Sequence, residues 1–307
     1  MEQLMRNFFQ FMAKNKSMTK LAKRYGLKFG AKRFVAGETL ADAVETIREL
    51  NKEGFAVTID HLGEFVETEK EANEMTEHSI EAIRAIKENN LDSQLSLKLT
   101  SMGMDISDDL VMRNMRRILD VAKECDVFVT IDMEDSGRCE KTLQIFETLR
   151  KEYDNLGTVI QAYLYRTLDD LDRLNAYHPN LRLVKGAYKE PETVAFPNKK
   201  DVDENYKKMI EKHLLNGNYT AIATHDDEII NFAKAFVKEH NIPNDQFEFQ
   251  MLYGIKVERQ KEILKEGYKM RLYVPYGTDW YGYFMRRLAE RPANVAFVLK
   301  GVFGKGS

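Results

Sequence analysis

The chain has 307 residues, of which 43% are hydrophobic and 31% are charged, and its net charge is −3. This balance is typical of a soluble globular protein that is long enough to bury a core, and it argues against nucleic-acid binding. No apolar run approaches the roughly 20 residues that a membrane helix needs, and the N-terminus lacks a secretion-signal pattern. Because the two cysteines have neither metal-site nor disulfide spacing, the sequence predicts a cytoplasmic protein.

Residues 1–36 form a basic arm. They contain nine lysines and arginines against one acid, Glu2, together with aromatic residues such as Phe8, Phe9 and Phe11. A basic segment with an apolar stripe can bind an anionic membrane surface, whereas most amphipathic helices pack on their own core. Both interpretations stay open, and the first would place the protein peripherally on the inner face of the membrane.

Helix and strand patterns then alternate along the chain. Strands are predicted at 55–60, 95–100, 127–133, 158–163, 181–188, 220–225, 247–252 and 270–274. Helices are predicted at 38–51, 68–90, 108–124, 138–153, 167–177, 204–215, 227–240, 256–266 and from Thr278 or Asp279 onward. Eight strands about thirty residues apart, each followed by a helix, predict an α/β fold of the TIM type, a closed (β/α)8 barrel.

The barrel is predicted to span residues 55–307, and residues 1–54 would hold the basic arm and the first helices. A doubly wound open sheet is the alternative fold. It fits this many units less well, and no glycine fingerprint follows the first strand to support a Rossmann fold.

Polar residues gather at the carboxyl ends of the predicted strands, where a barrel of this kind carries its active site. The set comprises Asp60, Glu64, Lys98, Asp132, Glu134, Gln161, Arg182, Lys185, Tyr188, Thr224, His225, Gln250 and Tyr273. Any one of them could be half of a buried ion pair or a satisfied hydrogen-bonding group. Since every strand contributes at least one, the pattern favours a ligand pocket.

The last predicted helix adds two arginines to this pocket. Tyr283 precedes Arg286 and Arg287 by three and four residues, so the three side chains can share one helix face. Two guanidinium groups beside a phenol suit a small carboxylate, although solvated surface arginines are the simpler interpretation of the helix alone. With the cations at the strand ends, the arginine pair predicts an anionic ligand.

The same residues make a poor metal site. His61, Asp132 and His225 show no ligand spacing, and nearby lysines would repel a cation. No Gly-x-Ser-x-Gly turn or plausible cysteine nucleophile is present either. The sequence therefore predicts neither a bound metal nor a covalent intermediate.

Four motifs occur in order along the second half of the chain. They are 181–188 (LRLVKGAY), 223–225 (ATH), 247–252 (FEFQML), and Tyr283 followed by Arg286 and Arg287. With these motifs the chain resembles the proline dehydrogenase family over residues 55–299, and its size is similar to that of the monofunctional bacterial branch. The resemblance implies a (β/α)8 barrel containing FAD. It also implies oxidation of L-proline to Δ1-pyrroline-5-carboxylate, the first step of proline catabolism, by hydride transfer to flavin N5, with electrons passed to a membrane quinone.

The resemblance further implies roles for individual residues. For the substrate, it implies that Arg286 and Arg287 bind the proline carboxylate, that Tyr188, Leu252, Tyr273 and Tyr283 wall the ring, and that Lys98 and Asp132 complete the pocket. For FAD, it implies contacts from Gln161, Arg182, Lys185, Gly186, Thr224, His225 and Gln250, with Arg182 near flavin N5. Glu64 would pair with Arg286 and help to gate entry.

One position departs from the family pattern. Lys189 follows the LRLVKGAY motif, where many relatives carry a tryptophan, so the flavin environment and affinity are expected to differ from those of the fused enzymes. Two other function classes remain open. A metal-dependent isomerase or hydrolase would need a divalent ion and survive loss of flavin, and an amino-acid sensor would have lost pocket residues, none of which is missing.

Overall fold

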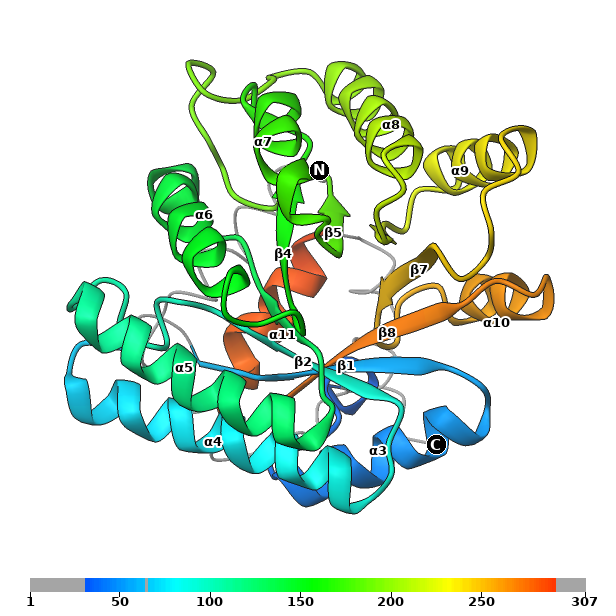
Figure 1. Ribbon diagram of the computed structural model, residues 1–307. Coiled ribbons are helices and arrows are strands. Elements are labelled where there is room, and N and C mark those ends of the chain that lie inside the picture. The colour runs from blue at the N-terminus through cyan, green and yellow to red at the C-terminus, as the bar shows by residue number, and fades with distance from the viewer. Residues whose placement is uncertain (1–30, 64–65, 291–307) are drawn as a thin grey trace.

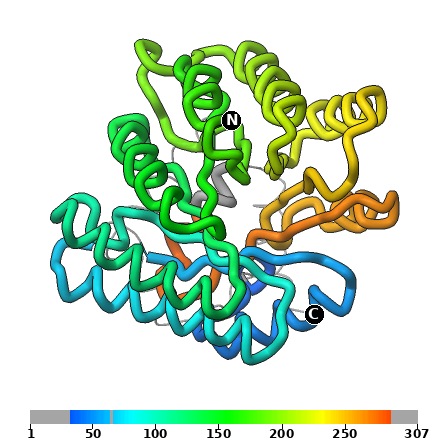
Figure 2. Tube along the Cα trace, in the orientation of Figure 1, coloured from blue at the N-terminus to red at the C-terminus, as the bar shows by residue number. Residues whose placement is uncertain are grey.

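The computed structural model describes residues 31–63 and 66–290, with side chains as far as residue 285. Within these residues eight strands pair in parallel, each with its neighbour in the chain, and the last strand closes onto the first. Figure 1 shows helices around this ring of strands, and the trace in Figure 2 passes round it in sequence order. The predicted (β/α)8 barrel is therefore confirmed, and the open-sheet alternative is wrong.

The elements have the following bounds. The strands are β1 Ala56–His61, β2 Ser93–Leu97, β3 Val129–Ile131, β4 Leu156–Gln161, β5 Leu181–Val184, β6 Thr220–Ala223, β7 Phe247–Leu252 and β8 Met270–Tyr276. The α-helices are α3 Leu40–Lys52, α4 Glu69–Glu88, α5 Asp108–Cys125, α6 Ser136–Arg150, α7 Thr167–Leu174, α8 Lys199–Leu215, α9 Asp227–Glu239, α10 Val257–Lys265 and α11 Trp280–Glu290. Two 3-10 turns, η2 Ala31–Arg33 and η3 Asn175–Tyr177, complete the described chain.

Local sequence explains where the first helices begin. Thr39 caps α3 by accepting a hydrogen bond from the Asp42 amide, and the Asp42 carboxylate accepts one from the Thr39 amide in return. Thr68 and Glu71 form the same reciprocal box at the start of α4. Each box satisfies backbone N–H groups that a helix end leaves without partners, so polar residues set the start of each helix.

The main hydrophobic core lies between the strands and the surrounding helices. Ile59 of β1 and Leu95 of β2 are almost completely buried with Ile83 of α4 and Ile118 of α5. In Figure 1, α4 and α5 run side by side along the outside of the barrel. Burying a side chain of this size contributes roughly 1.5–3 kcal/mol, so this layer stabilises the barrel and leaves its interior for polar groups.

The strand predicted at 181–188 ends at Val184, so the prediction is wrong for residues 185–188. The chain turns at Gly186, whose φ of +109° is rarely adopted by residues with a side chain. The helix predicted from residue 204 begins earlier, at Lys199. The prediction missed its first turn because the residues there are polar and show no apolar period. The loop between β5 and α8 therefore covers residues 185–198 and includes the predicted site residues Lys185, Gly186 and Tyr188.

The end of the basic arm packs on the barrel. Phe34 is completely buried and lies 6.1 Å from the Phe284 ring of α11, measured between ring centroids. The Ala36 amide donates to the Pro275 carbonyl at 2.9 Å. Residues 1–30, which make up most of the arm, lie outside the described residues. The packed interpretation therefore holds for the last residues of the arm.

His213 makes the stability of the fold depend on pH. It is a buried residue of α8, and burial lowers its pKa from 6.5 to about 4. The unfolded chain takes up a proton near pH 6.5 and the fold does not, so stability is complete above pH 6.5 and falls as the pH drops toward 4. We expect this group to cost about 1–2 kcal/mol of unfolding free energy between pH 6.5 and 5, measured by urea denaturation.

Two variants isolate this contribution. His213→Asn should flatten the slope of stability against pH in that window, whatever its effect on absolute stability. His178→Asn is the matched control, because His178 is exposed and its left-handed backbone suits asparagine. A His213→Asn slope equal to that of the wild type would contradict the assignment.

Candidate active site at the carboxyl end of the barrel

Asp132, directly after β3, is the centre of a buried polar cluster. Its Oδ1 atom accepts hydrogen bonds from Ser96 Oγ at 2.7 Å and from Arg182 Nη1 at 2.6 Å. Its Oδ2 atom accepts from the Tyr273 hydroxyl at 2.7 Å and from Lys98 Nζ at 3.3 Å. Because β3, β5 and β8 are not neighbours in the ring, these bonds cross the interior of the barrel.

The cluster keeps its carboxylate charged and its phenol protonated. Burial raises the pKa of a carboxyl group, but the charges of Lys98 and Arg182 hold the pKa of Asp132 below its ordinary value. Burial and the nearby Asp132 charge raise the pKa of Tyr273 well above 10. Lys98 also lies 3.6 Å from an Asp60 oxygen. At neutral pH, Tyr273 therefore donates to a fixed anion.

Arg182 is held on three sides. Its Nε atom donates to Gln250 Oε1 at 2.8 Å, Nη1 bonds Asp132 and Ser96, and the guanidinium lies 5.3 Å from the centre of the Tyr273 ring. The side chain is 6% exposed, yet its buried Nη2 atom bonds no residue that the structure describes. Buried polar atoms are nearly always satisfied, so Nη2 is a candidate ligand donor.

Gln161, the last residue of β4, carries a second such atom. Its Nε2 atom donates to the Glu134 carbonyl at 3.1 Å, which leaves Oε1 buried without a hydrogen bond to any part of the described chain. Gln161 and Arg182 belong to adjacent strands, β4 and β5. An acceptor and a donor are therefore available at the same end of the barrel.

The structure places Lys185 in an ion-pair network beside this cluster. Its Nζ atom contacts the carboxylates of Asp203 and Asp226, the latter at 2.6 Å. Thr224 joins the network, because its hydroxyl oxygen accepts from the Asp226 amide at 3.1 Å. The opposite charges of Lys185 and its two carboxylate partners hold the loops after β5 and β6 together.

His225 and Gly186 are also fixed by close contacts. The Leu252 amide donates to His225 Nε2 at 3.0 Å, so this nitrogen carries no proton. A side-chain carbon added at Gly186 would lie 2.5 Å from the Tyr163 ring. Glycine is therefore required at this position by both φ and space.

The remaining predicted site residues lie at the same end or outside the described part. Leu252 and Tyr188 are half-buried, and Tyr283 of α11 is buried. Only three residues separate β8 from α11, so this helix begins at the carboxyl end of the barrel. Glu64 lies outside the described residues. Arg286 and Arg287 belong to α11, but their side chains are beyond the described ones.

Three buried residues of the barrel interior were missed in the sequence. They are Ser96, Glu248 and Arg271, each two positions before a residue that the sequence did single out. Side chains two apart on a strand point the same way. The alternation of side chains along a strand could therefore have identified these three residues, because a polar residue two positions before an inward-facing residue also faces inward.

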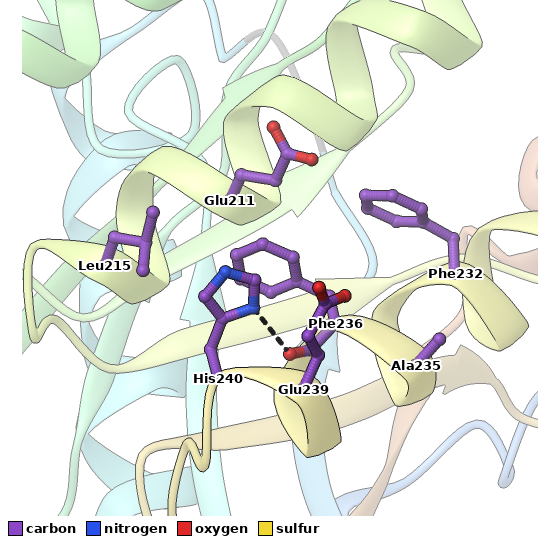
Figure 3. Close-up of a pocket in the computed structure, with 7 residues that line it drawn as sticks. All are labelled: Glu211, Leu215, Phe232, Ala235, Phe236, Glu239 and His240. Carbon is purple, nitrogen blue, oxygen red and sulfur yellow. Dashed lines mark hydrogen bonds between the residues drawn. The ribbon is translucent and has the colours of Figure 1, made fainter.

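The surface hollow in Figure 3 is separate from this cluster. It has a volume of about 530 Å³ and lies between α8 and α9, where it is lined by Leu215, Phe232, Phe236 and others. None of its lining residues was predicted to bind substrate or cofactor. A much smaller cavity of about 10 Å³ adjoins Ser96 and Lys98. The polar cluster is therefore closely packed, and the larger hollow lies elsewhere on the surface.

No three His, Cys, Asp or Glu side chains among the described residues are grouped as ligands of a metal ion. None of the described helices is both long enough and apolar enough to cross a membrane.

Comparison with known proteins decides the family. A family model described as proline dehydrogenase matches residues 43–300. The chain belongs to the proline dehydrogenase family. It is 58% identical over 302 residues to proline dehydrogenase 1 of Bacillus subtilis subsp. natto, covering 98% of this chain and 100% of the relative. It is 56% identical over 300 residues to proline dehydrogenase 2 of Bacillus subtilis strain 168, covering 98% and 99%.

A solved structure supports the same membership. The chain is similar to proline utilization A from Bdellovibrio bacteriovorus, inactivated by N-propargylglycine, with a TM-score of 0.80 and 27% identity. The match covers 90% of this chain and 34% of that one. The chain thus spans nearly the full length of the two Bacillus relatives and about a third of the proline utilization A chain.

Proposed function

We propose that this protein oxidises L-proline to Δ1-pyrroline-5-carboxylate with FAD as its cofactor and a membrane quinone as electron acceptor. The observation that carries the proposal is the buried cluster of Asp132, Arg182, Lys98 and Tyr273, in which Arg182 Nη2 bonds no described residue. The relatives at 58% and 56% identity are named proline dehydrogenases, which supports proline as the substrate.

The residues at the barrel end fit FAD. Arg182 Nη2 can donate to a ligand and Gln161 Oε1 can accept from one, and both atoms are buried. Lys185, Gly186, Thr224, His225 and Gln250 are the other residues that we propose to contact it. When bound, the flavin ring supplies a hydride acceptor at N5. Arg182 is a fixed cation that is shielded from solvent, so it would stabilise negative charge that develops during the reaction.

The substrate would lie beside the Asp132 cluster. Lys98 and Asp132 would border the pocket, and the Tyr273 ring is held by its hydroxyl bond to Asp132. Tyr188, Leu252 and Tyr283 would wall the pyrrolidine ring and exclude larger or more polar amino acids. Arg286 and Arg287 would orient the substrate through its carboxylate, with Glu64 pairing with Arg286 at the entrance.

Removing either arginine should weaken proline binding and leave the flavin bound. Each of Arg286→Ala and Arg287→Ala removes a charged hydrogen bond of roughly 1.5–3 kcal/mol, so the Michaelis constant for proline should rise by about 10- to 150-fold. Arg113→Ala is the control, because Arg113 forms an exposed pair with Glu69. Unchanged proline kinetics in both variants would exclude the carboxylate clamp.

An absorbance spectrum tests the proposed function directly. The purified protein should show flavin bands near 450 nm, and anaerobic L-proline should bleach them. A protein that neither carries nor binds FAD would refute the cofactor assignment. Flavin bands that proline leaves unchanged would refute the assignment of proline as the substrate.

We also propose that the basic arm brings the enzyme to the quinone. Nine basic residues and an aromatic stripe in residues 1–36 suit an anionic bilayer surface. Full-length protein should sediment with anionic liposomes more strongly than a protein lacking residues 1–30, which keeps the packed Phe34 segment. Equal sedimentation would rule this role out.

A further inference from the structure

A second buried ion pair lies inside the barrel, between Glu248 of β7 and Arg271 of β8. Each of the two residues comes two positions before a residue of the Asp132 cluster, Gln250 or Tyr273. Arg271 Nε donates to Glu248 Oε1 at 2.7 Å, and the two side chains are 2% and 1% exposed. Burial raises the pKa of a carboxyl group, but Arg271 holds the pKa of Glu248 down at about 2. Arg271 Nη1 also donates to the Val57 carbonyl at 2.6 Å. Glu248 is therefore a permanent acceptor.

Gln250 connects this pair to the Asp132 cluster. It lies two positions after Glu248 on β7, so both side chains face the interior. Gln250 Nε2 donates to Glu248 Oε1 at 2.6 Å, and Gln250 Oε1 accepts from Arg182 Nε at 2.8 Å. One unbroken chain of hydrogen bonds thus runs from Arg271 through Glu248 and Gln250 to Arg182.

The chemistry of an amide group makes this chain directional. A glutamine side chain has one end that donates and one that accepts, whereas an ionised carboxylate only accepts. Glu248 therefore holds the Gln250 NH₂ group toward itself, and the Gln250 oxygen must face Arg182. With the amide reversed, an NH₂ group would oppose the Arg182 Nε–H, and two donors cannot bond each other.

We propose that Glu248 is a positioning residue. It fixes the orientation of the Gln250 amide, and through it holds the Arg182 guanidinium so that Nη2 stays directed to a ligand. What Arg182 does for that ligand rests on the proposed function. The orientation of Arg182 itself does not, because Glu248, Gln250 and Arg182 are joined in the protein alone.

The competing explanation is that Glu248 serves only as the counterion of Arg271. Two variants separate these roles. Glu248→Gln keeps the size of the side chain but can donate as well as accept, so it no longer dictates the Gln250 orientation. Arg271→Lys disturbs the same ion pair and loses the Val57 bond, yet leaves Glu248 charged and in contact with Gln250.

The first readout needs no reaction. In protein labelled with ¹⁵N-arginine, the Arg182 Nε–H signal is assigned by its loss in Arg182→Lys, and its exchange with solvent is measured. Losing a buried hydrogen bond exposes the proton, so exchange should speed up by about tenfold or more in Glu248→Gln. Arg271→Lys should leave it within about twofold.

The second readout is the rate at which proline reduces the bound flavin. In Glu248→Gln the limiting rate should fall about tenfold, while the proline concentration for half-saturation stays unchanged, because Glu248 touches no part of the substrate pocket. If wild-type flavin is not reduced by proline, the proposed function fails, and the exchange measurement still decides the positioning role.

Loss of a buried partner can prevent folding, so a double variant is included. Glu248→Gln with Arg271→Gln removes both charges, and replacing a whole buried pair is often tolerated. It should show the same fast Arg182 exchange as Glu248→Gln. Unchanged exchange in every variant that lacks the Glu248 charge, or equal acceleration in Arg271→Lys, would overturn the proposal.

Discussion

Replacing Asp132 with alanine is expected to lower the free energy of unfolding by about 3–5 kcal/mol. The variant leaves the buried Arg182 and the partly buried Lys98 without their shared counterion, and it removes the acceptor for Ser96 and Tyr273. With proline as substrate, kcat/KM should fall by at least about 100-fold, because the pocket loses its fixed electrostatic arrangement. Urea denaturation and steady-state kinetics measure the two effects.

Two further variants show whether burial causes the loss. Asp132→Asn keeps the shape and one acceptor but not the charge, so its stability should lie between wild type and Asp132→Ala. Glu152→Ala breaks an ion pair with Arg116 in which both side chains are more than 40% exposed, and it should cost no more than about 1 kcal/mol. Equal losses in Asp132→Ala and Glu152→Ala would show that Asp132 is not the centre of the cluster.

Gly186→Ala should destabilise the protein by about 2–4 kcal/mol. The φ of +109° is strained for alanine, and the added carbon would lie 2.5 Å from the buried Tyr163 ring. The ring must move or the turn after β5 must open, and either change displaces Lys185, whose carbonyl accepts from the Tyr163 amide. We therefore also expect weaker FAD binding, measured by titrating FAD into the cofactor-free protein.

Gly217→Ala is the matched control for this effect. Gly217 also has a positive φ, +75°, but an added carbon there meets no atom within 4 Å. Gly217→Ala should lower the free energy of unfolding by about 1 kcal/mol, which is the contribution of the backbone conformation alone. If both alanine variants lose the same stability, contact with Tyr163 contributes nothing and the turn after β5 is not tightly packed.

Much of the architecture was predictable from local patterns. Alternating helices and strands at a regular spacing predicted the closed barrel, which the parallel pairing of β1 with β8 confirms. The boundaries were less predictable, as β5 and α8 show. A glycine turn at Gly186 ended an apolar run, and the polar first turn of α8 hid its start. Neither feature changes the hydrophobic period on which such predictions depend.

The candidate site was also predictable only in part from the sequence. Lys98, Asp132, Arg182, Gln250 and Tyr273 could be selected because they are polar residues of the predicted strands, and the structure joins them through one hydrogen-bonded cluster. Their roles toward proline and FAD stay predictions, as do those of Glu64, Arg286 and Arg287. The partner of each residue could not be predicted, because strand periodicity indicates a face and not a neighbour.

By itself, the amino-acid sequence determined the barrel, the end of it that carries polar residues, and the family to which the chain belongs. Only the tertiary structure decided that Arg182 bonds both Asp132 and Gln250. The physical reason is that these bonds join residues 50 and 68 positions apart across the same interior. Closure of the barrel brings them to hydrogen-bonding distance, and no local pattern records that distance.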